Sequence, residues 1–249
     1  TVPYTMRNPL YHWTHLELKN YFNVDRLLDP TSARGIYEKC TSMLQESEFS
    51  VQNLLRKTRV EVVCTTDDPT DTLQYHQQFA KQKAGFKMFP TFRPDKVFAV
   101  ENIKAWMDYL DRLASASGRS IKSYSDLVAA LQARVDFFDT LGCRASDHGL
   151  EHMYFEPDAE KQADTIFSKF RSGNNHDVLE QHTFKSAVLT ALGRMYHAKG
   201  WVQQFHVGAL RNNSTRMMRE LGADTGFDSI GDFPQAQSMS RFFNHLDNT

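Results

Sequence analysis

The chain has 249 residues, of which 41% are hydrophobic and 24% are charged, which is ordinary for a globular protein of one large domain or two small ones. Its formal net charge of −1 argues against nucleic acid as a partner, and we expect no membrane span and no signal peptide, because neither pattern is visible. The isolated cysteines Cys40, Cys64 and Cys143 suggest a reducing compartment without a zinc cluster, which predicts a cytoplasmic protein.

The first part of the chain is predicted to be helical. His12 and His15 lie three residues apart in a stretch of bulky apolar side chains, so both would share one helix face. A metal pair is conceivable there, but a packing helix with polar edges is the more common meaning of such a pair. Two further helices are expected, one starting at residues 29–32 and one over residues 50–57. We therefore predict a helical region over residues 1–57.

From Arg59 onward the sequence predicts a strand followed by a helix four times. The expected strands lie at residues 59–64, at 86–92, within 143–150 and within 200–213. Strands that alternate with helices imply a parallel sheet with right-handed crossovers. Four strands are too few for a closed barrel of eight, so residues 58–249 are predicted to form either an open sheet or about half of a barrel.

Local signals refine this prediction. Asp68 followed by Pro69 favours a helix start, and Pro90 interrupts the second strand near its end. Ser123-Tyr-Ser-Asp126 resembles a capping box. A long helix is expected from about His176 to Lys199, with three histidines on its solvent-facing side, namely His176, His182 and His197.

Side chains able to perform chemistry follow the predicted strands, at the edge where the carboxyl ends of parallel strands meet. Arg93 and Arg211 are candidates for holding a substrate carboxylate in forked geometry. Asp147, His148 and His206 are candidates for binding a divalent metal or moving protons. Together these groups suit a carboxylate-bearing sugar or a small acid.

Each candidate also has a structural interpretation. Asp67 and Asp68 are suited to capping helices or to hydrogen bonding at the rim of the sheet, and Arg93 could pair with Asp95. His148 could be a buried histidine oriented by a neighbour. The chain contains no glycine-rich phosphate loop and no G-x-S-x-G motif, which argues against nucleotide binding and serine-hydrolase chemistry.

Several stretches closely resemble the uronate isomerase (glucuronate isomerase) family, a family of metal-dependent (β/α)₈ barrels in the amidohydrolase superfamily. They are Asn8–Leu18, Thr65–Pro69, Arg93–Lys96, Ser146–His148, Trp201–Asn213 and Gly226–Ile230. The resemblance implies an α/β fold that is part of a TIM-type barrel, with about four parallel strands (two to five) after a helical insertion.

The resemblance also implies a function. It implies aldose–ketose isomerisation of hexuronates, D-glucuronate to D-fructuronate and D-galacturonate to D-tagaturonate, with proton transfer between C2 and C1 and a divalent metal, typically zinc. His206 matches the family's strand-five histidine at the metal centre, and Asp147 matches a strand-four acid in the active site. Arg93 and Arg211 match arginines that hold the substrate.

The chain departs from the family pattern at both ends of the barrel. The family's first strand carries a His-x-His metal pair followed by a histidine–tyrosine pair, and its last strand carries a metal-binding aspartate; none of these is found in this chain. We therefore expect an internal piece of a longer protein, with an incomplete active site. The alternatives are a metal-dependent hydrolase of the same superfamily and an inactive sugar-acid binding fragment. The expected partner is a small hexuronate, and homo-oligomerisation is left open.

Overall fold

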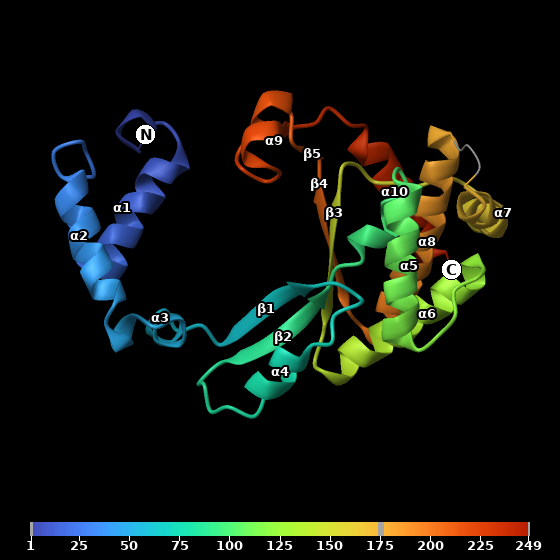
Figure 1. Ribbon diagram of the computed structural model, residues 1–249, viewed down its shortest axis with the longest axis horizontal. Helices are drawn as coiled ribbons and strands as arrows, with labels where there is room; N and C mark the ends of the chain where they lie inside the picture. The colour runs from blue at the N-terminus through green and yellow to red at the C-terminus, as the bar shows by residue number, and fades with distance from the viewer. Residues whose placement is uncertain (1, 174–176, 249) are drawn as a thin grey trace. The chain divides into compact units, whose positions relative to one another are not determined.

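The computed structural model describes residues 2–173 and 177–248, which form two compact units (Figure 1). One unit comprises Thr1–Val62 with Lys83–Lys87, and the other comprises Val63–Gln82 with Met88–Thr249. The short segment joins the first unit because Arg56 Nε donates to the Ala84 carbonyl oxygen at 2.6 Å. The domain boundary between residues 57 and 58 stays a prediction.

The first unit is helical. Its elements are η1 (Val2–Tyr4), α1 (Pro9–Phe22), α2 (Ala33–Leu44), η2 (Ser47–Phe49) and α3 (Val51–Lys57). The Asn8 side chain caps α1 by accepting a hydrogen bond from Leu10 N at 2.9 Å. Both ring nitrogens of His15 are engaged, Nδ1 with the Tyr11 carbonyl oxygen (2.7 Å) and Nε2 with Leu28 N (2.9 Å). His15 therefore orders the chain after α1, although α1 buries none of its own residues, so its role as a packing helix stays a prediction.

The second unit is built on a four-stranded sheet in the order β1-β2-β3-β4. The strands are β1 (Val62–Asp67), β2 (Lys87–Phe92), β3 (Ala145–Leu150) and β4 (Val202–Val207). β2 pairs with β3 and β3 with β4 in parallel, which confirms the predicted sheet. The register between β2 and β3 is Phe92↔Ser146 alone, in keeping with Pro90, which gives the ladder no donor.

Helices fill the connections between the strands and follow the last one. They are α4 (Gln74–Phe79), η3 (Asp95–Phe98), α5 (Ile103–Ser117), α6 (Tyr124–Thr140), α7 (Ala159–Arg171), α8 (Val178–Lys199), α9 (Thr215–Leu221) and α10 (Gln235–Asp247). The short strands β5 (Ala209–Leu210) and β6 (Ser229–Ile230) pair antiparallel on either side of α9. None of the helices in the described residues is long and apolar enough to cross a membrane.

The helices α5 to α8 lie on one side of β3 and β4, and the exposure of β4 follows that arrangement (Figure 1). Phe205 of β4 is partly buried and packs edge-on against the fully buried Phe242 of α10, with ring centroids 6.1 Å apart. The alternate residues Gln204 and His206 are exposed. One sheet face thus carries the core, and the other presents polar side chains near the strand ends.

One local prediction was right and one was wrong. The capping box at Ser123 and Asp126 is confirmed at the start of α6. Asp68 does not start a helix, because α4 begins only at Gln74. The Asp68 carboxylate instead closes a turn by accepting from Thr70 N (2.9 Å) and Thr70 Oγ1 (2.8 Å), a local bond that competes with helix capping.

The histidines of α8 divide between two environments. His197 is exposed, as predicted. His182 is only partly exposed, because its ring lies 5.1 Å from the rings of both His152 and Tyr154, so its predicted solvent-facing position was wrong. His176 lies outside the described residues.

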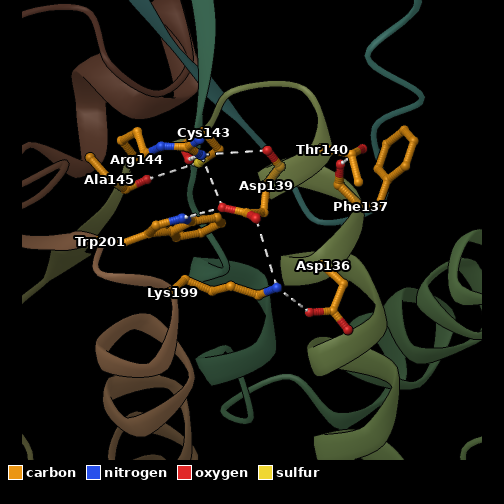
Figure 2. A network of polar contacts seen from close by, with 9 residues as sticks. All are labelled: Asp136, Phe137, Asp139, Thr140, Cys143, Arg144, Ala145, Lys199 and Trp201. Atoms are coloured by element: carbon orange, nitrogen blue, oxygen red, sulfur yellow. Dashed lines mark hydrogen bonds and ion pairs between the residues drawn. The ribbon is translucent and has the colours of Figure 1, made fainter.

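A polar network ties two helices to the beginning of β3 and β4 (Figure 2). Asp139 of α6 accepts a hydrogen bond from Trp201 Nε1 at 3.0 Å and pairs with Arg144 Nη1 at 2.9 Å. Lys199 at the end of α8 pairs with Asp136 at 2.9 Å. These contacts lie at the amino-terminal end of the strands. In β/α folds that end contributes to stability, whereas the chemistry takes place at the carboxyl end.

Candidate functional site

Three predicted residues meet at the carboxyl edge of the sheet: Arg93 directly after β2, Asp147 on β3 and His206 on β4. The backbone N–H of Arg93 donates to the Asp67 carbonyl oxygen at 2.9 Å, which extends the β1–β2 pairing to the residue that carries the guanidinium. Parallel strands end at the same edge, so residues distant in the sequence converge there.

The Asp147 carboxylate is the centre of this group. Its Oδ2 lies 2.6 Å from Arg93 Nη2, and its Oδ1 lies 2.8 Å from His206 Nε2. Asp147 is 5% exposed, whereas the His206 side chain is 54% exposed. A buried carboxylate held by a cation and an imidazole at an accessible surface has the geometry of a proton-transfer or ligand-binding site.

Gln204 belongs to the same group, although it was not among the candidates predicted from the sequence. It is the cross-strand neighbour of Asp147, and its Nε2 lies 3.3 Å from Asp147 Oδ1 and 2.8 Å from His206 Nε2. The signal available in the sequence was its spacing of two residues from His206, which places both side chains on one face of a strand. Gln204 therefore supplies a neutral polar group beside the carboxylate and the imidazole.

Asp95 contacts the guanidinium from a second direction. Its Oδ2 lies 3.6 Å from Arg93 Nε and accepts a hydrogen bond from Gly149 N at 3.0 Å, so the predicted pairing of Arg93 with Asp95 is confirmed. Burial raises the pKa of Asp95, and the charge of Asp147 adds to the rise, while the Gly149 N–H and Arg93 oppose it. The Arg93 guanidinium thus contacts two carboxylates: Asp147, which also contacts His206, and Asp95, which also accepts from Gly149 N.

His148 lies apart from this group, on the helix-facing side of β3. It is fully buried, its ring is stacked on Phe205 with centroids 5.4 Å apart, and Phe98 approaches it edge-on. Burial, with a smaller contribution from the charge of Arg93, lowers the pKa of His148 to about 3. His148 is therefore a neutral core residue, as the structural interpretation proposed, and not a partner of Asp147 in chemistry.

Arg211 is engaged elsewhere. Its Nη1 pairs with Asp228 Oδ2 at 2.6 Å, and Asp228 Oδ1 accepts a hydrogen bond from Asn212 N at 2.9 Å. The Asn212 hydrogen bond and the Arg211 contact lower the pKa of Asp228. Arg211 is 57% exposed at the side chain, and its part in substrate binding stays a prediction.

The described residues do not complete a metal site. His206 Nε2 and Asp147 Oδ1 are suitable donors 2.8 Å apart, but no group of three or more His, Cys, Asp or Glu side chains able to hold an ion occurs among the residues that the structure describes. Zinc in proteins takes three or four protein ligands. The two donors seen here would be part of such a set at most.

Comparison with known proteins gives a consistent result. A family model described as glucuronate isomerase matches residues 1–249. The chain is 52% identical to a uronate isomerase of Flavobacterium johnsoniae and 49% identical to one of Bacteroides fragilis, in each case over 99% of the chain and 53% of the relative. The chain therefore spans about half the length of the curated relatives that it matches.

Solved structures agree in fold. The crystal structure of uronate isomerase from Thermotoga maritima matches with a TM-score of 0.91 and 31% identity, over 99% of this chain and 54% of that one. The structure of glucuronate isomerase from Caulobacter crescentus matches with a TM-score of 0.88 at 23% identity, over 98% of this chain and 50% of that one, and it supports the fold alone.

Proposed function

Because the chain belongs to the glucuronate isomerase family, we propose that the protein interconverts hexuronates by aldose–ketose isomerisation, D-glucuronate with D-fructuronate and D-galacturonate with D-tagaturonate. The observation that carries this proposal is the meeting of Arg93, Asp147 and His206 at the carboxyl edge of the sheet. The reaction conserves mass: a proton moves from C2 to C1 while the hydroxyl proton on O2 is lost and one is gained on O1. Such a reaction on a uronate is served by an anion-binding group and a proton carrier side by side.

The residues divide these tasks. Arg93 keeps further N–H donors beyond the one directed at Asp147, and a guanidinium suits the forked geometry of a uronate carboxylate. Asp147 and His206 lie within hydrogen-bond distance of each other, so a proton taken from the sugar by one can be held or returned by the pair. Arg211 is our second proposed contact for the substrate. To bind the substrate carboxylate, Arg211 would either break its ion pair with Asp228 or use the N–H groups that Asp228 does not contact.

A divalent metal, for which zinc is our proposal, would polarise the sugar oxygens in such a reaction. The family is of the amidohydrolase type, which is generally metal-dependent. His206 is the residue of this chain that we propose as a ligand. The donors in the described residues do not fit a complete site, so the remaining ligands would have to come from outside them.

The absence of three clustered donors in the described residues favours a second candidate, which is binding of a sugar acid without catalysis. Hydrolysis by another amidohydrolase-type reaction is the third. Cytoplasmic location and self-association stay predictions.

The test is incubation of the purified protein with D-glucuronate, with and without added zinc, followed by ¹³C NMR of the sugar. Appearance of the ketose at unchanged mass supports isomerisation. Separate titrations of zinc and glucuronate then classify a negative result: sugar binding without conversion supports the binding fragment, and binding of neither contradicts the proposal for this chain.

A further inference from the structure

The guanidinium of Arg93 contacts two carboxylates through two different nitrogens, and the two carboxylates differ in what else they contact. Asp147 approaches Nη2 at 2.6 Å and is shared with His206. Asp95 approaches Nε at 3.6 Å and also accepts a hydrogen bond from Gly149 N. A guanidinium held at one nitrogen alone can rotate about its bonds, whereas contacts at two nitrogens restrict that rotation.

Asp95 is itself fixed by β3. Its Oδ2 accepts the backbone N–H of Gly149, and a Cβ atom at position 149 would lie 3.0 Å from that same oxygen. Glycine at this position therefore permits the close approach of the carboxylate to the strand. Asp95 links the end of β2, which carries Arg93, to the neighbouring strand that carries Asp147.

Two buried atoms in this contact have no hydrogen-bond partner: Arg93 Nε and Asp95 Oδ1. One is a donor and the other an acceptor, and they belong to residues already in ionic contact. Unpaired buried polar atoms are costly, so a small rotation that brings the Arg93 Nε–H to the Asp95 carboxylate is favoured. Neither atom is accessible to a ligand, which argues for a role in holding the arginine and against direct contact with substrate.

We propose that Asp95 is a positioning residue, which restricts rotation of the Arg93 guanidinium through its contact at Nε and leaves the remaining N–H groups available to an anionic ligand. Its effect on substrate rests on the proposed function, since it assumes that the ligand is a uronate carboxylate. Its effect on Arg93 does not depend on any ligand.

The first measurement is therefore made on the protein without ligand. Hydrogen exchange of the Arg93 Nε–H, assigned with Arg93→Lys, is followed by ¹H–¹⁵N NMR in the wild type, Asp95→Asn and Asp95→Ala. We expect exchange to be at least about tenfold faster in Asp95→Ala and intermediate in Asp95→Asn, which keeps an acceptor oxygen but loses the charge. The Trp201 Nε1–H, bonded to Asp139 at the opposite end of the strands, reports whether each variant is folded.

The second measurement uses substrate. The dissociation constant for D-glucuronate, or KM where turnover occurs, is expected to rise about tenfold in Asp95→Asn, with a smaller change in kcat because Arg93 holds the carboxylate and not the reacting carbons. Asp108→Asn on the exposed side of α5 removes a charge elsewhere and is expected to leave both values unchanged.

The outcomes separate the two proposals. Unchanged Nε–H exchange in a folded Asp95→Ala or Asp95→Asn variant overturns the positioning role. A wild-type protein that neither binds nor converts hexuronate contradicts the proposed function, and the exchange measurement still decides what Asp95 does.

Discussion

His148 makes the stability of the second unit dependent on pH, in a direction that the structure determines. Burial lowers the pKa of this fully enclosed imidazole from 6.5 to about 3, so the folded state keeps it neutral while the unfolded state takes up a proton near pH 6.5. Between these two values the unfolded state binds more protons, and the free energy of unfolding must fall as the pH falls.

The magnitude follows from the two pKa values. The slope approaches roughly 1.4 kcal/mol per pH unit below the unfolded-state pKa, which makes the loss between pH 7 and pH 5 about 2 kcal/mol for this residue. His152 and His182, whose pKa values are also lowered, chiefly by burial, contribute in the same direction. A variant that lacks only His148 isolates its part.

The assay is urea unfolding at both pH values, followed by tryptophan fluorescence, for the wild type and His148→Leu. The wild type is expected to lose about 2 kcal/mol more than the variant on acidification. His197→Leu, which removes an exposed histidine of α8, serves as the matched control and is expected to behave as the wild type. Equal pH dependence of the wild type and His148→Leu would refute the assignment of His148 as a neutral core residue.

Two further pairs of variants test the packing of the sheet, each by urea unfolding. Gly142→Ala is expected to lower the free energy of unfolding by about 1–3 kcal/mol, because the φ of Gly142 is +87° and a Cβ there would lie 2.6 Å from ring carbons of Phe89. Gly35→Ala in α2 meets open space and should be neutral or stabilising by about 0.5–1 kcal/mol. Equal effects of the two substitutions would contradict the predicted clash with Phe89. Phe242 is fully buried, so Phe242→Ala is expected to lower the free energy of unfolding by about 3–5 kcal/mol. Phe243 is 51% exposed, and Phe243→Ala is expected to lower it by less than about 0.5 kcal/mol. A small loss for Phe242→Ala would show that α10 contributes little to the packing of the core.

The sequence was sufficient to predict the convergence of Arg93, Asp147 and His206. Arg93 directly follows β2, His206 lies near the end of β4 and Asp147 lies within the short β3; the alternation of strands with helices predicts a parallel sheet in which these segments lie side by side. That rule concerns topology, so it holds without knowledge of any side-chain contact.

The face of the strand was harder to predict than its end. Asp147 and His148 are adjacent in the sequence and looked equivalent, but consecutive residues of a strand point to opposite faces. Which face is covered depends on helices distant in the sequence: the ring of His148 meets Phe98 and Phe205, while Asp147 meets Arg93. A single residue of uncertainty in register would have exchanged their roles.

Asp68 shows where local chemistry misleads. An aspartate before proline fits the start of a helix, yet the same carboxylate can close a turn on Thr70 or pair with a distant cation. Here Lys96 Nζ lies 3.0 Å from Asp68 Oδ2, and Tyr109 donates to Oδ1 at 3.2 Å. These two long-range contacts stabilise the turn conformation of Asp68, and the local sequence pattern cannot predict them.

The partner of Arg211 could not be predicted from the strand ends. Arg211 comes five residues after His206, so the rule that placed His206 at the edge of the sheet also placed Arg211 there. After β4 the chain turns at Gly208 and pairs β5 with β6, and Asp228, 17 residues further along the chain, contacts the guanidinium. A pairing of two-residue strands across α9 leaves almost no periodic signal, since two residues cannot display alternation. An arginine held in this way is already ordered before any ligand binds, so recruiting it to a substrate carboxylate requires that the carboxylate either displace Asp228 or accept from the N–H groups that Asp228 leaves free.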